Sequence, residues 1–220
     1  MMLGYLQDLA QALDIESMLD ALLRVVAVLL CLTVHEVSHG LAAYHLGDPT
    51  ARSRRRLSLN PLRHIDWFGL AMMLLAGFGW AKPVPVDFRY FKDPKKGMAI
   101  TALAGPVSNL ILAVLAIGVS KVIYLYAPYH QAFDVAFVFL LYILAPLSVG
   151  LGLFNLLPIP PLDGSKVLAA FLPDRAYLTL MYYERYGLFL LLALSYFGVT
   201  GNLISGAIQG VYLWLFGLFY

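Results

Sequence analysis

The sequence predicts an all-α, polytopic membrane protein that forms a single domain over residues 1–220. Hydrophobic residues make up 61% of the chain and charged residues only 13%, which is typical of proteins that cross a bilayer several times. The uncharged runs are long enough for about five transmembrane helices. The formal net charge of +2 is too small to indicate a nucleic-acid partner.

The chain begins with two predicted helices. Residues 1–18 alternate apolar and acidic side chains at helical spacing, which favours an amphipathic helix on the membrane surface. They contain no basic region of the kind that opens a cleavable signal peptide. The first transmembrane helix is expected over residues 19–46. It ends before Gly47, a residue well suited to follow a helix C-terminus.

Residues 66–92 interrupt the series of long spans. The uncharged run over 67–81 is short for a full crossing and is interrupted by glycines, so we expect a re-entrant segment. In residues 81–91, prolines forbid a helix, whereas β-branched and aromatic residues favour an extended chain. An edge strand and a plain cytoplasmic loop are equally consistent with this stretch.

Four further hydrophobic segments complete the predicted spans: residues 97–125, 135–162, 186–199 and 203–220. The last of them either spans fully or lies partly in the interface.

The basic residues predict the topology. Nearly all of the 15 lysines and arginines fall within residues 48–66, 82–96 and 163–185, so the positive-inside rule places these segments in the cytoplasm. The N-terminus of this integral cell-membrane protein is then expected outside. We interpret the arginine run over 52–56 as juxtamembrane charge and not as a nucleic-acid site.

The strongest functional signal lies inside the first span, where residues 35–39 read H-E-x-x-H. On a helix, His35 and His39 project from one face and can bind one metal ion together. Neutral imidazoles suit zinc, and Glu36 can act as general base towards a water molecule at the ion. A chance match is disfavoured, because ionisable residues within a bilayer are costly and usually functional. The site lies nearer the cytoplasmic end of the span.

Asp163 is the best candidate for a third ligand, since a catalytic zinc usually takes three protein ligands and a water. It follows a long uncharged run at a point where prolines break the helix. Irregular backbone at membrane depth is tolerated only inside the protein or beside a wet cavity. The alternative is an aspartate that caps the next helix. Asn155 has an amide that can bind an oxyanion or an extended substrate, and a helix-packing role is equally consistent.

Together these motifs resemble the site-2 protease family of intramembrane zinc metalloproteases, in a minimal form without PDZ or CBS domains. The resemblance is carried chiefly by residues 35–39 and 155–164, with further similarity over 60–66, 79–86 and 105–109. It implies hydrolysis of a peptide bond within or beside a transmembrane helix of another protein.

The resemblance also implies roles for individual residues. It makes Asp163 the third zinc ligand and Asn155 a residue that binds the substrate or the oxyanion. Asn109 would lie near the site on the substrate or oxyanion side, and His64 would support the metal ligands. Residues 81–91 would form a small membrane-associated β-hairpin.

We therefore expect a zinc-dependent endopeptidase with one zinc ion per chain, which cleaves transmembrane segments of membrane-protein substrates. An intact helix hides its carbonyls in hydrogen bonds, so the substrate must unwind locally. Val84 and Val86 would then pair with the unwound segment as an added strand. The expected partners are transmembrane protein substrates and the lipid bilayer.

Two other functions are consistent with the same residues. A metal or proton transporter could also place His, Glu and Asp within a bilayer, but it would need a polar path to the outer face. The spans after the site offer few charged residues towards that face. A non-catalytic zinc-binding membrane sensor would use the same ligands, although every position needed for hydrolysis is filled.

Overall fold

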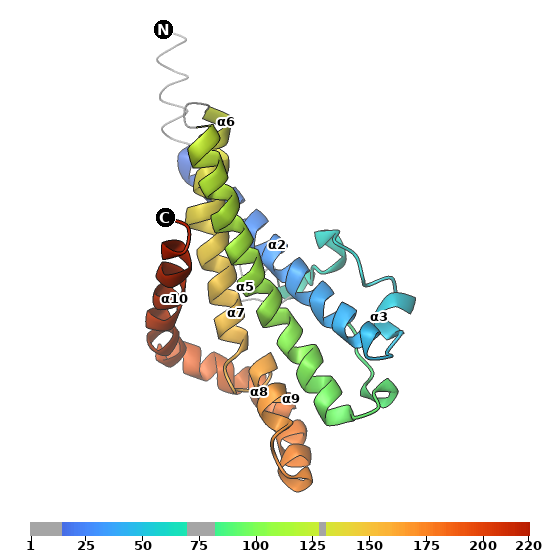
Figure 1. The fold of residues 1–220 in the computed structure, drawn as a ribbon. Helices are drawn as coiled ribbons and strands as arrows, with labels where there is room; N and C mark the ends of the chain where they lie inside the picture. The colour runs from blue at the N-terminus through green and yellow to red at the C-terminus, as the bar shows by residue number, and fades with distance from the viewer. Residues whose placement is uncertain (1–14, 70–81, 128–130) are drawn as a thin grey trace.

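The computed structural model describes residues 15–69, 82–127 and 131–220, and within these ranges the fold is helical with no β-strand. Its longest helices are α2 (Ile15–His45) and α5 (Pro94–Tyr126), which pack against each other (Figure 1). A third long segment runs beside α5. It consists of α6 (Gln131–Val138), a π-helical turn (Phe139–Leu144) and α7 (Ala145–Asn155).

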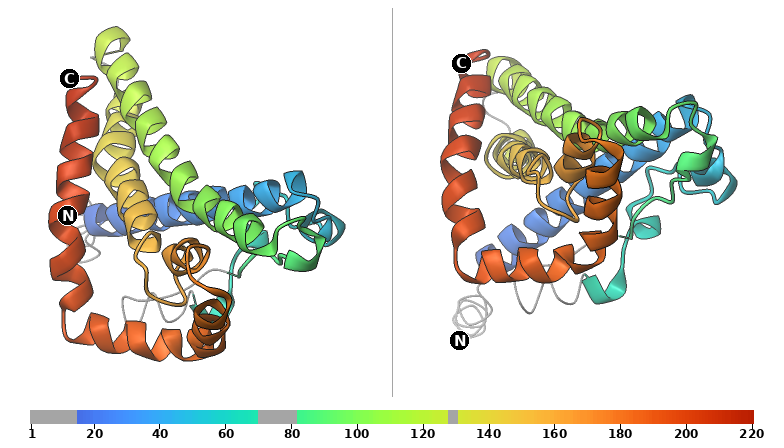
Figure 2. Two further views of the ribbon diagram at one scale, coloured as in Figure 1. Left: turned by 60° about the horizontal axis from the view of Figure 1, so that its bottom comes forward. Right: turned by 90° about the horizontal axis from the view of Figure 1, so that it is seen from below.

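Shorter elements complete the described fold. The helix α3 (Thr50–Ser53) and a 3-10 turn (Pro61–Arg63) follow α2, and a second 3-10 turn (Phe88–Tyr90) precedes α5. After α7 come α8 (Asp163–Ala169), α9 (Asp174–Tyr196) and α10 (Val199–Gly217). The end of α9 leads crosswise into α10, which returns alongside α7 (Figure 2).

Three helical segments are long and apolar enough to cross a bilayer: Ser17–His45, Pro94–Tyr126 and Phe133–Asn155. They confirm the prediction of an integral membrane protein. A shorter apolar helix, Ile204–Gly217, lies within α10. The total of five spans is not confirmed. The predicted span over 186–199 is mostly the second half of α9, and the first half of this helix carries charged side chains, so α9 as a whole is not an apolar span.

The interior between α2, α5, α7 and α10 contains mostly small and branched apolar side chains. Small residues let helix backbones approach closely, which is the usual basis of helix packing in a bilayer. The fully or almost fully buried members are Ala27, Cys31, Ala113, Ala116, Ile117, Leu141, Ile143, Leu144, Ala145, Val149 and Leu215.

Pro146 accounts for the π-helical turn before α7. It has no N–H to donate to the carbonyl of Tyr142 one turn earlier, so the helix widens over Phe139–Leu144. The hydroxyl of Tyr212 donates to the carbonyl of Leu141 at 2.9 Å. This bond attaches α10 to the irregular turn and so to the span that leads to the site.

Residues 82–87, which we call the strap, lie outside any helix or strand and are anchored at both ends. The Lys82 N–H donates to the His64 carbonyl at 2.9 Å, and the Asp87 N–H donates to Asp48 Oδ2 at 2.7 Å. Arg56 adds a guanidinium bond to the Lys82 carbonyl at 2.7 Å. Asp48 itself is fully buried, so the second anchor lies inside the protein.

The expected β-hairpin is not confirmed. No strand occurs in the described part of residues 81–91, because the N–H groups of Val84 and Asp87 bond to carboxylates and the two prolines have none. Residues 70–81, which would supply the rest of the hairpin and the re-entrant segment, lie outside the described residues. So does most of the amphipathic helix expected over 1–18.

Candidate metal centre

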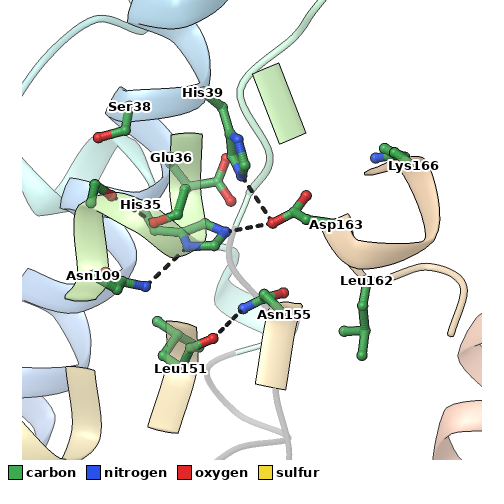
Figure 3. Close-up of polar contacts among 12 residues, drawn as sticks. His35, Glu36, Ser38, His39, Asn109, Leu151, Asn155, Leu162, Asp163 and Lys166 are labelled. Atoms are coloured by element: carbon green, nitrogen blue, oxygen red, sulfur yellow. Dashed lines mark hydrogen bonds and ion pairs between the residues drawn. The ribbon is translucent and has the colours of Figure 1, made fainter. Parts of the chain in front are cut away.

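His35, His39 and Asp163 converge from two helices that are distant in sequence (Figure 3). Asp163 Oδ2 lies 3.0 Å from His35 Nε2 and 3.2 Å from His39 Nε2, and the three ligand atoms lie within 4.8 Å of one another. In a tetrahedral zinc site with bonds of about 2.0 Å, neighbouring ligand atoms are about 3.3 Å apart. Two imidazole nitrogens and one carboxylate oxygen at these separations therefore fit a single zinc ion.

Each ligand is positioned by its local sequence. His35 and His39 are one turn apart on α2, with their rings edge to face at 4.5 Å between centroids. Asp163 is the first residue of α8, reached by the loop 156–162. Gly164 permits this approach, since a Cβ there would lie 2.1 Å from the Leu156 carbonyl oxygen.

One face of α5 supports both histidines. The Nδ1 of His39 donates to the Thr101 carbonyl at 2.7 Å, and the Nδ1 of His35 lies 3.0 Å from Asn109 Nδ2. Gly105, midway between them, has no side chain that could occupy the space of the two rings. Thr101, Gly105 and Asn109 are four residues apart in turn, so they share a stripe of the helix, which we call the histidine-facing stripe.

Glu36 projects into a cavity of about 350 Å³ that also contains the three ligands. Its Oε2 accepts the backbone N–H of Val84 at 2.8 Å. Val86 lines the same cavity from the strap. Asn155 reaches it from the end of α7, where its Nδ2 donates to the Leu151 carbonyl at 2.9 Å (Figure 3).

The structure therefore brings most of the expected site residues to one cavity and leaves two outside it. Asn109 is completely buried behind His35 and is not part of the cavity wall. His64 is also buried and does not line the cavity. Its Nε2 bonds to the Ser58 carbonyl at 2.8 Å, and its own carbonyl holds the strap at Lys82.

Sequence reasoning missed three residues at this site. Thr101 and Gly105 contact the histidines, and the spacing of four between 101, 105 and 109 was the available signal. Lys166, one turn after Asp163 on α8, lines the cavity and forms an ion pair with Glu184 of α9 at 3.5 Å. The spacing of three residues between Asp163 and Lys166 was the sequence signal for Lys166, because it places both side chains on one face of a helix.

The chain is similar to known proteins over most of its length. The model of peptidase family M50 matches residues 118–194. A Bacillus subtilis protein named "Putative zinc metalloprotease YwhC" is 39% identical over 171 residues, which cover 77% of this chain and 78% of the relative.

Two mycobacterial relatives are both named "Putative zinc metalloprotease Rip2". The one from Mycobacterium tuberculosis H37Rv is 30% identical over 195 residues, or 86% of this chain and 71% of the relative. The one from Mycolicibacterium smegmatis is 34% identical over 142 residues, or 62% and 52% of the two chains. No solved structure matches the chain.

Proposed function

Because this chain belongs to peptidase family M50, the site-2 protease family, we propose that it is a zinc-dependent endopeptidase that cleaves transmembrane segments of other membrane proteins. The observation that carries the proposal is the convergence of His35, His39 and Asp163 beside Glu36 in one cavity of a membrane-embedded helical fold. These groups supply three metal ligands and a base.

His35 Nε2, His39 Nε2 and Asp163 Oδ2 would hold one zinc ion per chain. When bound, zinc lowers the pKa of a water molecule and polarises a carbonyl oxygen. The Val84 N–H fixes one carboxylate oxygen of Glu36, which leaves the other oxygen to take a proton from water and to give it to the leaving nitrogen. The low exposure of the ligands, 4% for His35 and 9% for Asp163, keeps competing solvent away from them.

The cavity indicates the form in which substrate binds. A helix with side chains is about 10–12 Å across, so a space of about 350 Å³ accommodates only a short unwound segment. The Val84 N–H is occupied by Glu36, so Val86 is the better donor for an added strand. Alternate residues of an extended chain point their N–H groups to the same side. Asn155 would bind the substrate backbone or the oxyanion if its amide left the Leu151 carbonyl.

The topology is part of the same proposal. We place the N-terminus outside and the metal centre towards the cytoplasmic side. Tyr220, which follows α10, contacts Ser120 and Tyr124 near the outer end of α5, so α10 would cross outwards as a fourth span, and the end of α9 would not be a span of its own. The arginines after α2 and the lysines before α5 support this orientation, because cytoplasmic loops are enriched in basic residues.

Turnover and zinc content measured on the same samples test the proposal. Glu36→Gln keeps an oxygen that can accept the Val84 N–H but cannot take a proton, so it should retain zinc and lose activity about 10²- to 10⁴-fold. His35→Ala, His39→Ala and Asp163→Ala should each lose zinc by elemental analysis. The assay is cleavage of a transmembrane-segment fusion in proteoliposomes, with products identified by mass spectrometry.

The outcomes separate the competing functions. Glu36→Gln activity close to wild type would assign the base to another residue. Metal flux through the same proteoliposomes without proteolysis would favour a transporter. Tight zinc binding with neither activity would favour a sensor. Comparison of membrane peptides from cells with wild type and with Glu36→Gln would then identify the substrates.

A further inference from the structure

Asn109 is buried beside His35, and its backbone is bonded to α7. It lies on α5 with no exposed surface, and its Nδ2 is 3.0 Å from His35 Nδ1. Its backbone carbonyl accepts the hydroxyl of Ser148, a buried residue of α7, at 2.7 Å. Because Asn109 is behind the imidazole and not on the cavity wall, it cannot touch a peptide bound in the cavity.

A metal-binding imidazole needs a hydrogen-bond acceptor at its other nitrogen. When Nε2 gives its lone pair to an ion, Nδ1 carries the proton and must donate it, and such partners fix the ring's orientation. For His39 the acceptor is the Thr101 carbonyl at 2.7 Å. For His35, whose Nε2 faces Asp163, the only side chain bonded to Nδ1 in the described part of the protein is Asn109.

The amide of Asn109 can bond to His35 Nδ1 whether this nitrogen accepts a hydrogen bond or donates one. With Nδ2 towards Nδ1, the His35 proton resides on Nε2 and points at Asp163, and Asn109 Oδ1 is buried without a partner. A half-turn of the amide places Oδ1 opposite Nδ1, which gives this oxygen a donor and leaves Nε2 free to bind an ion. Each arrangement leaves one amide atom without a partner, so the amide alone favours neither. An ion bound at Nε2 favours the second arrangement, because it requires the proton to be on Nδ1.

We propose that Asn109 is a positioning residue: its side-chain oxygen accepts the His35 Nδ1–H and so aligns His35 Nε2 with the metal. The proposal rests on the zinc site of the proposed function. It assigns Asn109 to the metal centre rather than to the substrate or the oxyanion. It also assigns one role to the whole histidine-facing stripe. The Thr101 carbonyl accepts from His39, the Asn109 amide bonds to His35, and Gly105 leaves space for both rings.

Zinc affinity, measured by competition with a chelator on the purified full-length protein, tests the proposal. Asn109→Leu keeps the side-chain size without an acceptor and should weaken zinc binding about 10- to 100-fold. Asn109→Asp keeps an acceptor oxygen, and a carboxylate is a common partner of a metal-binding histidine, so this variant should bind zinc within about a few-fold of wild type. Asn155→Leu is the matched control. The Asn155 amide contacts a backbone carbonyl and no metal ligand, so this variant should leave the zinc affinity unchanged.

A second readout distinguishes positioning from catalysis. Excess zinc should restore much of the turnover of Asn109→Leu if the residue acts through His35. Wild-type zinc affinity with turnover lost at every zinc concentration would instead place Asn109 on the reacting groups and overturn the proposal. Equal loss of affinity in Asn109→Asp and Asn109→Leu would show a packing role only. If Asn109→Leu does not fold, Asn109→Ala takes its place against Asn109→Asp.

The experiment also separates this inference from the proposed function. A wild-type protein that binds no zinc would overturn both. Tight zinc binding in wild type with the same affinity in Asn109→Leu would overturn the role of Asn109 alone.

Discussion

Replacement of Gly105 by alanine should weaken zinc binding far more than it destabilises the fold. A Cβ at this position would lie 2.5 Å from His39 Nε2 and Cε1 and 2.7 Å from His35 Cε1. Non-bonded heavy atoms prefer about 3.5–4.0 Å, so the overlap is about 1 Å. Overpacking of this size costs about 1–3 kcal/mol.

The two rings can relieve that overlap by turning away, but then they no longer converge on Asp163. Zinc binding must reimpose the clash, so its free energy should fall by the same 1–3 kcal/mol, which corresponds to about 5- to 150-fold weaker affinity. Folding without zinc avoids the clash and gains up to about 1 kcal/mol of helix propensity from glycine to alanine. Thermal stability of the zinc-free protein should therefore stay close to that of wild type.

Gly118→Ala is the control, because it makes the same change on the same helix. The three heavy atoms nearest to its Cβ would all belong to the edge of the Phe219 ring, at 3.3 Å or more, and the ring can shift slightly. The measurement is chelator competition for zinc, with circular dichroism melting of the metal-stripped proteins. Unchanged zinc affinity in Gly105→Ala would refute the role assigned to the histidine-facing stripe, and an equal loss in Gly118→Ala would show that α5 tolerates no added methyl.

Three further outcomes are expected. Val84→Pro should lower turnover and spare zinc content, because it removes the N–H that holds Glu36; unchanged kinetics would contradict this. Cysteines placed at Ser53 and at Tyr126, in a Cys31→Ser background, should react with impermeant reagents from opposite sides of sealed vesicles, and reaction from one side would refute the proposed topology. Asp93→Ala should lower the melting temperature at neutral pH. Its carboxylate accepts the N–H of Lys96 at the start of α5, which lowers the pKa of Asp93. This stabilisation is present above the ordinary aspartate pKa of about 3.9 and is lost as the pH falls through the lower folded-state value. The two proteins should therefore converge in strong acid, and a constant difference would point to a different cause.

The spacing of His35 and His39 could be predicted from sequence because helical periodicity alone places them on one face. Asp163 could be predicted because a carboxylate at a break in an apolar segment needs a cation. Neither argument depends on how separate helices pack. The role of the histidine-facing stripe does depend on it, since Gly105 and Asn109 face His35 only through the packing of α5 on α2.

In the strap, the local pattern correctly predicted a non-helical segment, but the strand pairing expected from it is not confirmed. Alternating prolines and valines do keep residues 82–87 out of a helix, and Asp87 at the end of the strap has an extended backbone. Whether such a chain pairs as a strand depends on where its N–H groups find acceptors. Here Glu36 and Asp48, which are 48 and 39 residues away from their donors in the chain, supply those acceptors. No local sequence signal marks contacts at that range.

The bond from Val84 to Glu36 also fixes the register of the strap. Its donor lies between Pro83 and Pro85, neither of which has an N–H, so a slip by one residue would place a proline opposite the carboxylate and lose the bond. Because the donor is a backbone group, any residue other than proline at position 84 can provide it. The bond to Glu36 therefore depends on the backbone position of residue 84, and any insertion or deletion within 82–87 would disturb it.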